Sequence, residues 1–388
     1  MTSNGDPVGT VLPPVRDKLL DCAPMTADLI DSDRALADLC RALAGEATLV
    51  LDTEFVRERT YRARLCLVQV AAGRELALID PLALTDLAPL TALLATGAQT
   101  KVLHAARQDL EVFFDAGRVL PAPLFDTQIG AAFLGFDDQL GYGALVQRLL
   151  GVTLDKSHTR TDWSARPLSA AQLRYAADDV HHLGPAYERV REQLAARGRL
   201  DWAQAESAAL LDPALYAADP EEAWRRLRGG ADLTPPQQQV LRTLAAWRER
   251  TAQERDRPRS WIVRDEVLFE LARRTPQTAQ ALAAITGLEE RTRSRHGAAL
   301  LAAIDAGLKA DPQPLWTAVA PLDRAQNESV RRLMTRVREL GTAREIAPSL
   351  LATRRDIERL VRGADPAALF GGWRAELLAP LIGELTSL

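Results

Sequence analysis

Apolar and polar positions follow one pattern in the first half of this chain and another in the second. Near the start, the apolar residues form short runs rich in strand formers, and such runs predict strands. Gly73 supplies a turn between the second run and the third, so the first three predict a meander. The runs lie at 48–51, 65–70, 76–79 and 101–103, and a helical pattern follows at 105–116.

Helical periodicity dominates after residue 131. Ser169 and Gln172 form a capping-box pattern, which predicts that a helix starts there, and apolar residues recur inside it at the spacing of one helix face. Thr234 and Gln237 form a second such pattern, and only helical runs follow it. These runs lie at 237–255, 265–274, 278–285 and 295–307, then, after a proline-containing break at 311–314, at 325–340, 354–361 and 372–387.

The change of pattern predicts an α/β domain followed by two small all-α domains. The first residues carry Gly and Pro without an apolar period, so we expect a flexible N-terminal extension there. The expected bounds are 1–25 for this extension, 26–205 for the α/β domain, 213–308 for the first helical domain and 315–388 for the second.

The composition narrows the class of protein. Hydrophobic residues make up 47% and charged residues 26% of the chain, as in a globular protein, and no long uncharged apolar run predicts a membrane span. The start lacks the basic and apolar segments of a secretory signal. The three cysteines (Cys22, Cys40 and Cys66) are scattered, so we expect neither a disulfide scaffold nor a zinc site, and a cytoplasmic location.

The net charge of −4 argues mildly against a nucleic-acid partner, because nucleic-acid-binding domains are often basic. An acidic metal site would lower the net charge without hindering binding elsewhere. Such a site is suggested by Asp52 and Glu54, which stand at positions i and i+2 of a predicted strand and therefore face the same way. Two adjacent carboxylates repel unless a cation lies between them, and oxygen ligands suit Mg²⁺ or Mn²⁺. The alternative is a polar strand end in solvent.

Three further residues carry candidate chemistry. Asp109 lies on the helix that follows the fourth strand, where it is otherwise an ordinary surface residue. Tyr175 and Asp179 are four residues apart on the capped helix, so they share one face and together suit the orientation of a water molecule. The alternative interpretation is that Tyr175 and Asp179 lie at the rim of a half-buried helix and have no catalytic role. Asp178 lies about 100° around the helix from Asp179 and is expected to point away.

The order of these residues and the sequence around each of them resemble the motifs of the DEDD exonuclease superfamily, tyrosine subtype. Within this superfamily they resemble the ribonuclease D family. The matching segments are LDTEF at 51–55, HAARQDLEVFF at 104–114 and TDWSARPLSAAQLRYAADDV at 161–180. The resemblance extends from about residue 30 to the end of the chain. It implies a ribonuclease H-like mixed sheet flanked by helices.

The resemblance also implies a two-metal hydrolysis, with divalent ions about 4 Å apart. Asp52 would bridge both ions, Glu54 and Asp179 would hold the ion that activates water, and Asp109 would serve the second ion. Tyr175 would position the attacking water. All five residues are thus expected to be catalytic, and the four carboxylates to be metal ligands. The expected cofactors are two Mg²⁺ or Mn²⁺ ions.

Four neighbouring residues are predicted to contact nucleic acid. Phe55 follows the carboxylates and is suited to stack on a terminal base, with core packing as the alternative. Lys156 and Arg160 belong to a polar, basic loop before the tyrosine helix, which is either a phosphate contact or a solvated loop. His104 is expected to support the site rather than to react. Nearby Asp126 is interpreted as a helix N-cap.

The two helical regions resemble HRDC domains, the first more specifically than the second. The first contains many arginines, which suit contacts with phosphates, although interleaved acids also suit a salt-bridged surface. The resemblance predicts a monomeric 3′→5′ exoribonuclease that acts on tRNA precursors and other structured small RNAs and has no membrane partner. The alternatives are a DNA 3′→5′ exonuclease and a non-catalytic RNA-binding module.

Overall fold

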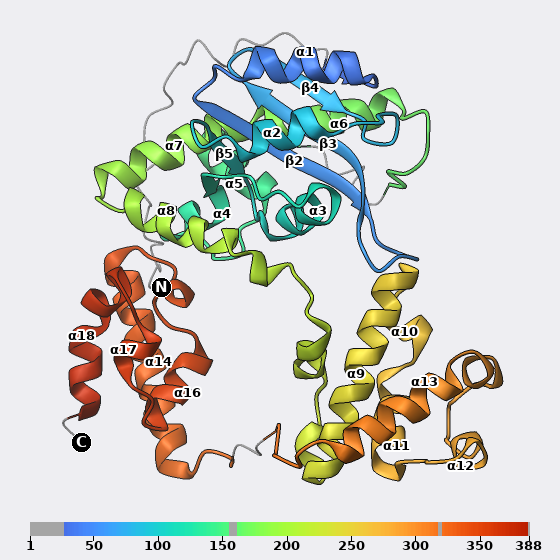
Figure 1. The fold of residues 1–388 in the computed structure, drawn as a ribbon. Helices are drawn as coiled ribbons and strands as arrows, with labels where there is room; N and C mark the ends of the chain where they lie inside the picture. The colour runs from blue at the N-terminus through green and yellow to red at the C-terminus, as the bar shows by residue number, and fades with distance from the viewer. Residues whose placement is uncertain (1–26, 155–160, 317–319, 387–388) are drawn as a thin grey trace, which may run out of the picture.

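A computed structural model describes residues 27–154, 161–316 and 320–386 of the chain (Figure 1). One domain contains a sheet and its helices, and two purely helical domains lie below it in the view. The predicted N-terminal extension, 1–25, lies outside the described residues. No helix in the described ranges combines the length and the apolar character needed to cross a bilayer.

Within the described residues, six strands form one mixed sheet in the order β1-β4-β3-β2-β5-β6. The pairs β2–β3 and β3–β4 are antiparallel, which confirms the predicted meander, and the other pairs are parallel. The outer strands β1 and β6 were not predicted because each has only three residues. The strands are β1 (Asp28–Ile30), β2 (Thr48–Val56), β3 (Arg64–Ala72), β4 (Glu75–Ile79), β5 (Thr100–Leu103) and β6 (Leu124–Asp126).

Helices cover both faces of this sheet, and an apolar core lies on each. Leu49 and Leu51 of β2 join one core with α1, α2 and α3, whereas Val50 joins the other with α4 to α8. This division follows from the alternation of side chains along a strand. The helices are α1 (Asp33–Leu43), α2 (Ala88–Ala95), α3 (Arg107–Gly117), α4 (Thr127–Ala132), α5 (Tyr142–Leu150), α6 (Ala170–His181), α7 (Leu183–Ala196) and α8 (Leu200–Ala208).

A buried aspartate fixes the beginning of α3. Asp126 is 3% exposed, and its carboxylate accepts hydrogen bonds from the backbone N–H groups of Ala105, Ala106 and Gln128 at 3.0, 2.9 and 2.8 Å. It therefore caps α4, as predicted, and also holds the turn before α3. Ala105 has a φ of +56°, a conformation that alanine rarely adopts, so α3 begins at Arg107 and not at residue 105.

The first helical domain follows a linker of short 3₁₀ turns and has its own apolar core. Both predicted capping boxes are present, at Ser169–Gln172 and at Thr234–Gln237. The turns are η1 (Ala209–Leu211), η2 (Pro213–Leu215), η3 (Pro220–Arg226) and η4 (Gly230–Asp232). The helices are α9 (Pro235–Arg255), α10 (Arg259–Ile262), α11 (Asp265–Arg274), α12 (Ala279–Ala283) and α13 (Glu290–Lys309).

The second helical domain packs directly on the sheet domain and shares one of its cores. Trp373 stacks on Trp202 of α8 with ring centroids 5.4 Å apart, and Arg374 donates to both oxygens of Glu206 at 2.6 and 2.7 Å. Gly135, at φ +84°, makes the approach possible, because a Cβ there would lie 3.0 Å from a backbone carbon. The helices are α14 (Arg324–Arg344), α15 (Pro348–Leu351), α16 (Arg354–Val361), α17 (Pro366–Leu369) and α18 (Trp373–Thr386).

The first helical domain contacts the sheet domain through the loop 57–63, which joins β2 to β3. The N–H groups of Tyr61 and Arg62 donate to one oxygen of Asp256 at 3.0 and 3.1 Å. The Tyr61 hydroxyl donates to Glu249, a buried carboxylate that also accepts from Arg259. This loop directly follows the strand that carries Asp52 and Glu54, so the helical domain is connected to that strand.

Candidate active site

Strand β2 places two carboxylates beside each other. Asp52 and Glu54 lie on the same face of the strand as Val50, toward α6 and α7, and both are partly buried. The pairing of β2 with β3 shifts register between Glu54 and Phe55, so the regular ladder ends immediately after the second carboxylate. Such irregularities redirect side chains at the ends of strands.

Helix α6 brings the predicted tyrosine and aspartate to the same place. Its capping box fixes where the helix starts, and the spacing of four residues then sets Tyr175 and Asp179 on one face. The Tyr175 hydroxyl donates a hydrogen bond to the Asp179 carboxylate. Asp178 is exposed and does not line the cavity that contains Asp179, as its position on the helix predicted.

Asp109 reaches the site from the first turn of α3 and is 7% exposed. Its carboxylate accepts a hydrogen bond of 2.5 Å from the hydroxyl of Thr53, the residue between the two strand carboxylates. Alternate residues of a strand face opposite sides, so Thr53 points away from the face that carries Asp52 and Glu54. Asp109 therefore contacts β2 on the opposite face. The site is therefore assembled around the end of β2 from both faces of the sheet.

All five predicted catalytic residues line one cavity of about 710 Å³. Four of them are carboxylic acids, and no lysine or arginine stands among the described residues that line this cavity. The uncompensated negative charge changes how these acids titrate. A cluster of like charges in a partly dry cavity favours the neutral acids.

The pKa values follow this expectation. Burial, followed by the charge of Asp179, raises the pKa of Glu54 to about 8. Burial, followed by the charge of Asp178, raises the pKa of Asp179 to about 7, and burial raises that of Asp109 to about 6. Asp52 has a pKa well above its usual range because it is buried and its charge is opposed by the other three carboxylates. Asp52 is thus the electrostatic centre of the cluster.

The donor set fits hard divalent cations, because it consists of carboxylate oxygens that need positive charge in order to ionise together. No three His, Cys, Asp or Glu side chains in the described part of the chain are arranged so that they could hold one ion as they stand. A bound cation would supply the positive charge that allows these acids to ionise together.

Known proteins identify the family. A family model described as a 3′-5′ exonuclease matches residues 28–195, and an HRDC domain model matches residues 237–304. Ribonuclease D of Acidiphilium cryptum is 45% identical, over 90% of this chain and 90% of its own length. The chain belongs to the ribonuclease D family. Ribonuclease D of Escherichia coli is 39% identical over 93% of this chain and 98% of its own length.

The fold agrees with this membership. A crystal structure of E. coli RNase D, described as an exoribonuclease involved in structured RNA processing, matches with a TM-score of 0.83 and 37% identity, over 94% of this chain and 99% of that chain. As a ribonuclease D, the chain is a 3′→5′ exoribonuclease of a divalent-metal-dependent class, with RNA as its substrate class. The predicted family, enzyme class and fold class are confirmed.

Sequence reasoning missed two residues that line the cavity, Thr53 and Tyr142. Thr53 was overlooked because a threonine between two acids has no chemical signature of its own. Tyr142, at the start of α5, lines the cavity and donates from its hydroxyl to the backbone oxygen of Asp178 at 3.1 Å. Burial, followed by the charges of Asp179 and Asp52, raises the pKa of Tyr142 well above its usual range, so it stays a neutral donor.

The four residues predicted to contact nucleic acid in this ribonuclease D differ in their surroundings. Phe55 lines the cavity and also packs against one core, so both of its interpretations fit. His104 lines the cavity, but its Nδ1 lies 2.9 Å from the Thr127 hydroxyl and its Nε2 lies 2.9 Å from the Leu140 oxygen. Both ring nitrogens are thus engaged by the protein, and contact between His104 and nucleic acid stays a prediction. Lys156 and Arg160 lie outside the described residues.

The raised pKa values predict how the metal-free protein responds to pH. Glu54 has a folded pKa of about 8 against an ordinary value of 4.5, so its contribution to stability is present at low pH and lost as the pH rises through 8. We expect the midpoint of thermal unfolding in EDTA to fall as the pH rises from about 4.5 to about 8, the range between the ordinary pKa of Glu54 and its pKa in the folded protein. The slope cannot exceed about 1.4 kcal/mol per pH unit for each proton. Glu54→Gln should flatten the decline, whereas an unchanged slope in that variant would contradict the assignment.

Proposed function

We propose that this ribonuclease D removes nucleotides one at a time from the 3′ ends of tRNA precursors and other structured small RNAs. The observation that carries the proposal is the cavity in which four carboxylates and Tyr175 converge, in a chain with this family membership. Each cut breaks the last phosphodiester bond, adds water across it and releases a nucleoside 5′-monophosphate.

Asp52, Glu54, Asp109 and Asp179 are proposed to hold two divalent cations, Mg²⁺ or Mn²⁺. When bound, such ions lower the pKa of an attacking water and stabilise the charge on the leaving 3′ oxygen. Asp52, whose charge is opposed by the other three carboxylates, would contact both cations. The charges of Glu54 and Asp179 oppose each other, so these two acids would share one cation, and Asp109, which reaches the cavity from α3, would hold the other.

Tyr175 is proposed to orient the attacking water. Its hydroxyl is hydrogen-bonded to Asp179, and its pKa is raised beyond the normal range by burial and by Asp179, so the phenol remains protonated at any physiological pH. A fixed neutral hydroxyl beside a carboxylate can hold one water at a defined angle. The ring centroid of Trp163 lies 6.1 Å from that of Tyr175, and both rings belong to one apolar cluster.

Replacing Tyr175 with phenylalanine should therefore lower kcat by up to about 10²-fold, because a poorly placed nucleophile loses that much rate. KM should change little, since the ring and its packing remain. Single-turnover kinetics on a short labelled RNA would measure the effect. Tyr142→Phe is the matched control, because this second tyrosine of the cavity donates to a backbone oxygen and should cost less. Equal losses in the two variants would contradict the proposed role of Tyr175.

The test of the whole proposal is a time course on a 5′-labelled RNA with a tRNA-like stem and a 3′ extension. Mg²⁺ and Mn²⁺ would be compared, with EDTA as the control. We expect a ladder that shortens from the 3′ end and disappears in EDTA. Equal cleavage of a DNA strand of the same sequence would favour the alternative DNA exonuclease, and binding without cleavage would favour a non-catalytic module.

Three further features belong to this proposal. The catalytic domain would span residues 26–205, the first HRDC domain 213–308 and a second, HRDC-like domain 315–388. The enzyme would act as a monomer, which is supported by the apolar surface that the second helical domain covers within the same chain. Its location would be the cytoplasm, where RNA precursors are processed. Light scattering at micromolar concentration would reveal a dimer if this inference were wrong.

A further inference from the structure

The hairpin of β2 and β3 extends beyond the sheet and ends against the first helical domain (Figure 1). Its loop, 57–63, is absent from the described residues that line the catalytic cavity, and no step of the proposed hydrolysis uses it. Polar contacts nevertheless join this loop to α9 on one side and to α3 on the other. Because β2 and α3 carry three of the four acids of the cavity, the position of the loop bears on the geometry of the site.

A buried carboxylate of α9 holds the loop most firmly. Glu249 is 1% exposed and accepts hydrogen bonds from the Tyr61 hydroxyl and, at 2.5 and 2.6 Å, from Arg259. A second arginine, Arg226, donates to it at 3.1 Å. Burial opposes the ionisation of Glu249, but the hydrogen bonds from Arg259 and Tyr61 outweigh burial and lower its pKa, so the carboxylate is charged. Hydrogen bonds to a charged acceptor are the stronger kind, and Tyr61 makes one of them.

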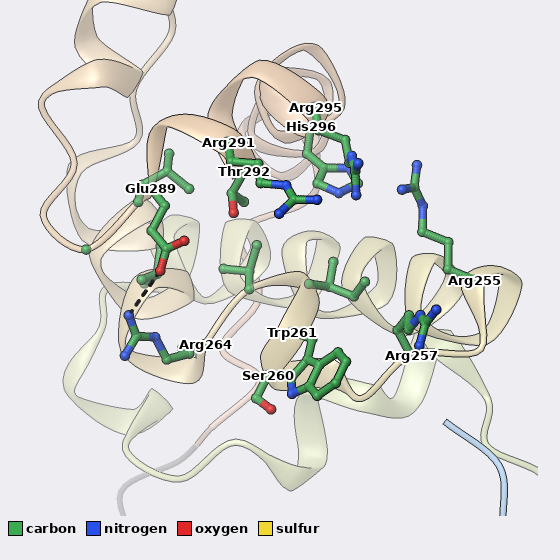
Figure 2. Close-up of a pocket in the computed structure, with 15 residues that line it drawn as sticks. Arg255, Arg257, Ser260, Trp261, Arg264, Glu289, Arg291, Thr292, Arg295 and His296 are labelled. Atoms are coloured by element: carbon green, nitrogen blue, oxygen red, sulfur yellow. Dashed lines mark ion pairs between the residues drawn. The ribbon is translucent and has the colours of Figure 1, made fainter. Parts of the chain in front are cut away.

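Further contacts seat the same part of the loop in the helical domain. The ring of Tyr61 packs against the core of that domain, and the Arg259 guanidinium lies 4.7 Å from its centroid. The Tyr61 N–H donates to Asp256, where α9 ends. Figure 2 shows Arg257 at the edge of a groove of about 740 Å³, and this arginine donates to the Arg59 oxygen of the loop at 3.3 Å. The helical domain therefore contacts both the side chains and the backbone of the loop.

On its other side the loop contacts α3, the helix of Asp109. Arg57 pairs with Glu111 at 2.9 Å, and Arg62 pairs with Asp115 at 3.6 Å. The two acids are four residues apart and so share one face of α3. The side chains of Arg57 and Glu111 are 38% and 39% exposed, and ion pairs of this kind stabilise little by themselves. They can hold α3 only as firmly as α9 holds the loop.

We propose that Tyr61 is a positioning residue for the hydrolysis: seated in the first helical domain, it holds the loop that fixes the end of β2 against α3. The proposal rests on the proposed function, in which Asp52 and Glu54 of β2 and Asp109 of α3 hold the cations at a defined separation. The pairing of β2 with β3 shifts register directly after Glu54, so the regular ladder does not fix the end of the strand, and the loop does.

The test releases the loop with the double variant Tyr61→Ala, Asp256→Gly in the full chain. Glu249 keeps both arginine partners, and glycine suits the φ of +46° at the second position, so the fold should be retained. Hydrogen exchange of the metal-free protein is measured at 52–56 and 105–110. The second measurement is the Mn²⁺ concentration that gives half-maximal hydrolysis of a labelled RNA dinucleotide, a substrate whose length confines it to the cavity.

Exchange in both segments should become roughly tenfold faster in the double variant, because the end of β2 and the start of α3 open more often. The half-maximal Mn²⁺ concentration should rise roughly tenfold, since residues that orient metal ligands change metal affinity by at least that factor. KM for the dinucleotide, and kcat at saturating Mn²⁺, should change less than about twofold. Tyr61→Phe keeps the packed ring and loses only the bond to Glu249, so its effects should be smaller.

The double variant Glu206→Gln, Arg374→Gln is the matched control, because it also removes polar contacts between a helical domain and the sheet domain, but at α8. Its exchange rates and Mn²⁺ requirement should equal those of the wild type. An unchanged Mn²⁺ requirement in the loop variant would overturn the proposal, even with faster exchange, and so would an equal rise in the control. A wild type that leaves the dinucleotide intact at every Mn²⁺ concentration would instead overturn the proposed function, before any variant is compared.

Discussion

Asp52→Asn should abolish hydrolysis, with kcat/KM lower by at least about 10³-fold, equivalent to about 4 kcal/mol of transition-state stabilisation. Asparagine has the same shape but no negative charge. Asp52 is the acid whose charge is opposed by all three of the others, so it is the position at which a cation gains most. The measurement is single-turnover hydrolysis of a labelled RNA in saturating Mg²⁺ or Mn²⁺.

The same substitution should not harm the fold. Asparagine in this buried cluster needs neither a negative charge nor an added proton, so the Asp52→Asn protein in EDTA should unfold at a higher temperature than the wild type near pH 8. This opposite effect on activity and on stability separates a catalytic role from a structural one. Hydrolysis near the wild-type rate, or a lower unfolding temperature, would count against Asp52 as a metal ligand. Asp178→Asn, on the exposed side of α6, is the matched control.

Asp126→Ala is expected to be the most damaging substitution outside the cavity, with a loss of about 4 kcal/mol in the free energy of unfolding. Three backbone N–H groups, of which that of Ala106 is buried, lose their acceptor, and the left-handed conformation of Ala105 loses the hydrogen bond that holds it. Urea denaturation followed by circular dichroism would measure the change.

Activity should fall with Asp126→Ala even in the folded fraction, because Asp109 lies in the helical turn that Asp126 positions. Asp86→Ala is the matched control. Asp86 is exposed and accepts from the Ala88 N–H at 2.8 Å, so water can replace it at a cost of about 1 kcal/mol or less. If both variants lost a similar free energy of unfolding, the burial of the Asp126 carboxylate would not explain its contribution to stability.

The sequence by itself determined the local features of this site. The i, i+2 spacing of Asp52 and Glu54 sets both on one face of β2, and the spacing of Tyr175 and Asp179 sets both on one face of α6, because strand and helix geometry are local properties. The capping boxes at Ser169 and Thr234 likewise depend only on neighbouring residues, and both helices begin where these predict. The family motifs supplied the order of the acids along the chain.

Only the tertiary structure decided how separate segments meet. No local pattern indicates that Thr53 holds Asp109, that Asp126 supports the turn before α3, or that Trp373 stacks on Trp202. These contacts join residues far apart in sequence, and they are selected by the packing of whole elements. The arginines at 255, 257, 264, 291 and 295 likewise come from separate segments of the chain, and only the fold gathers them around one groove together with the exposed ring of Trp261.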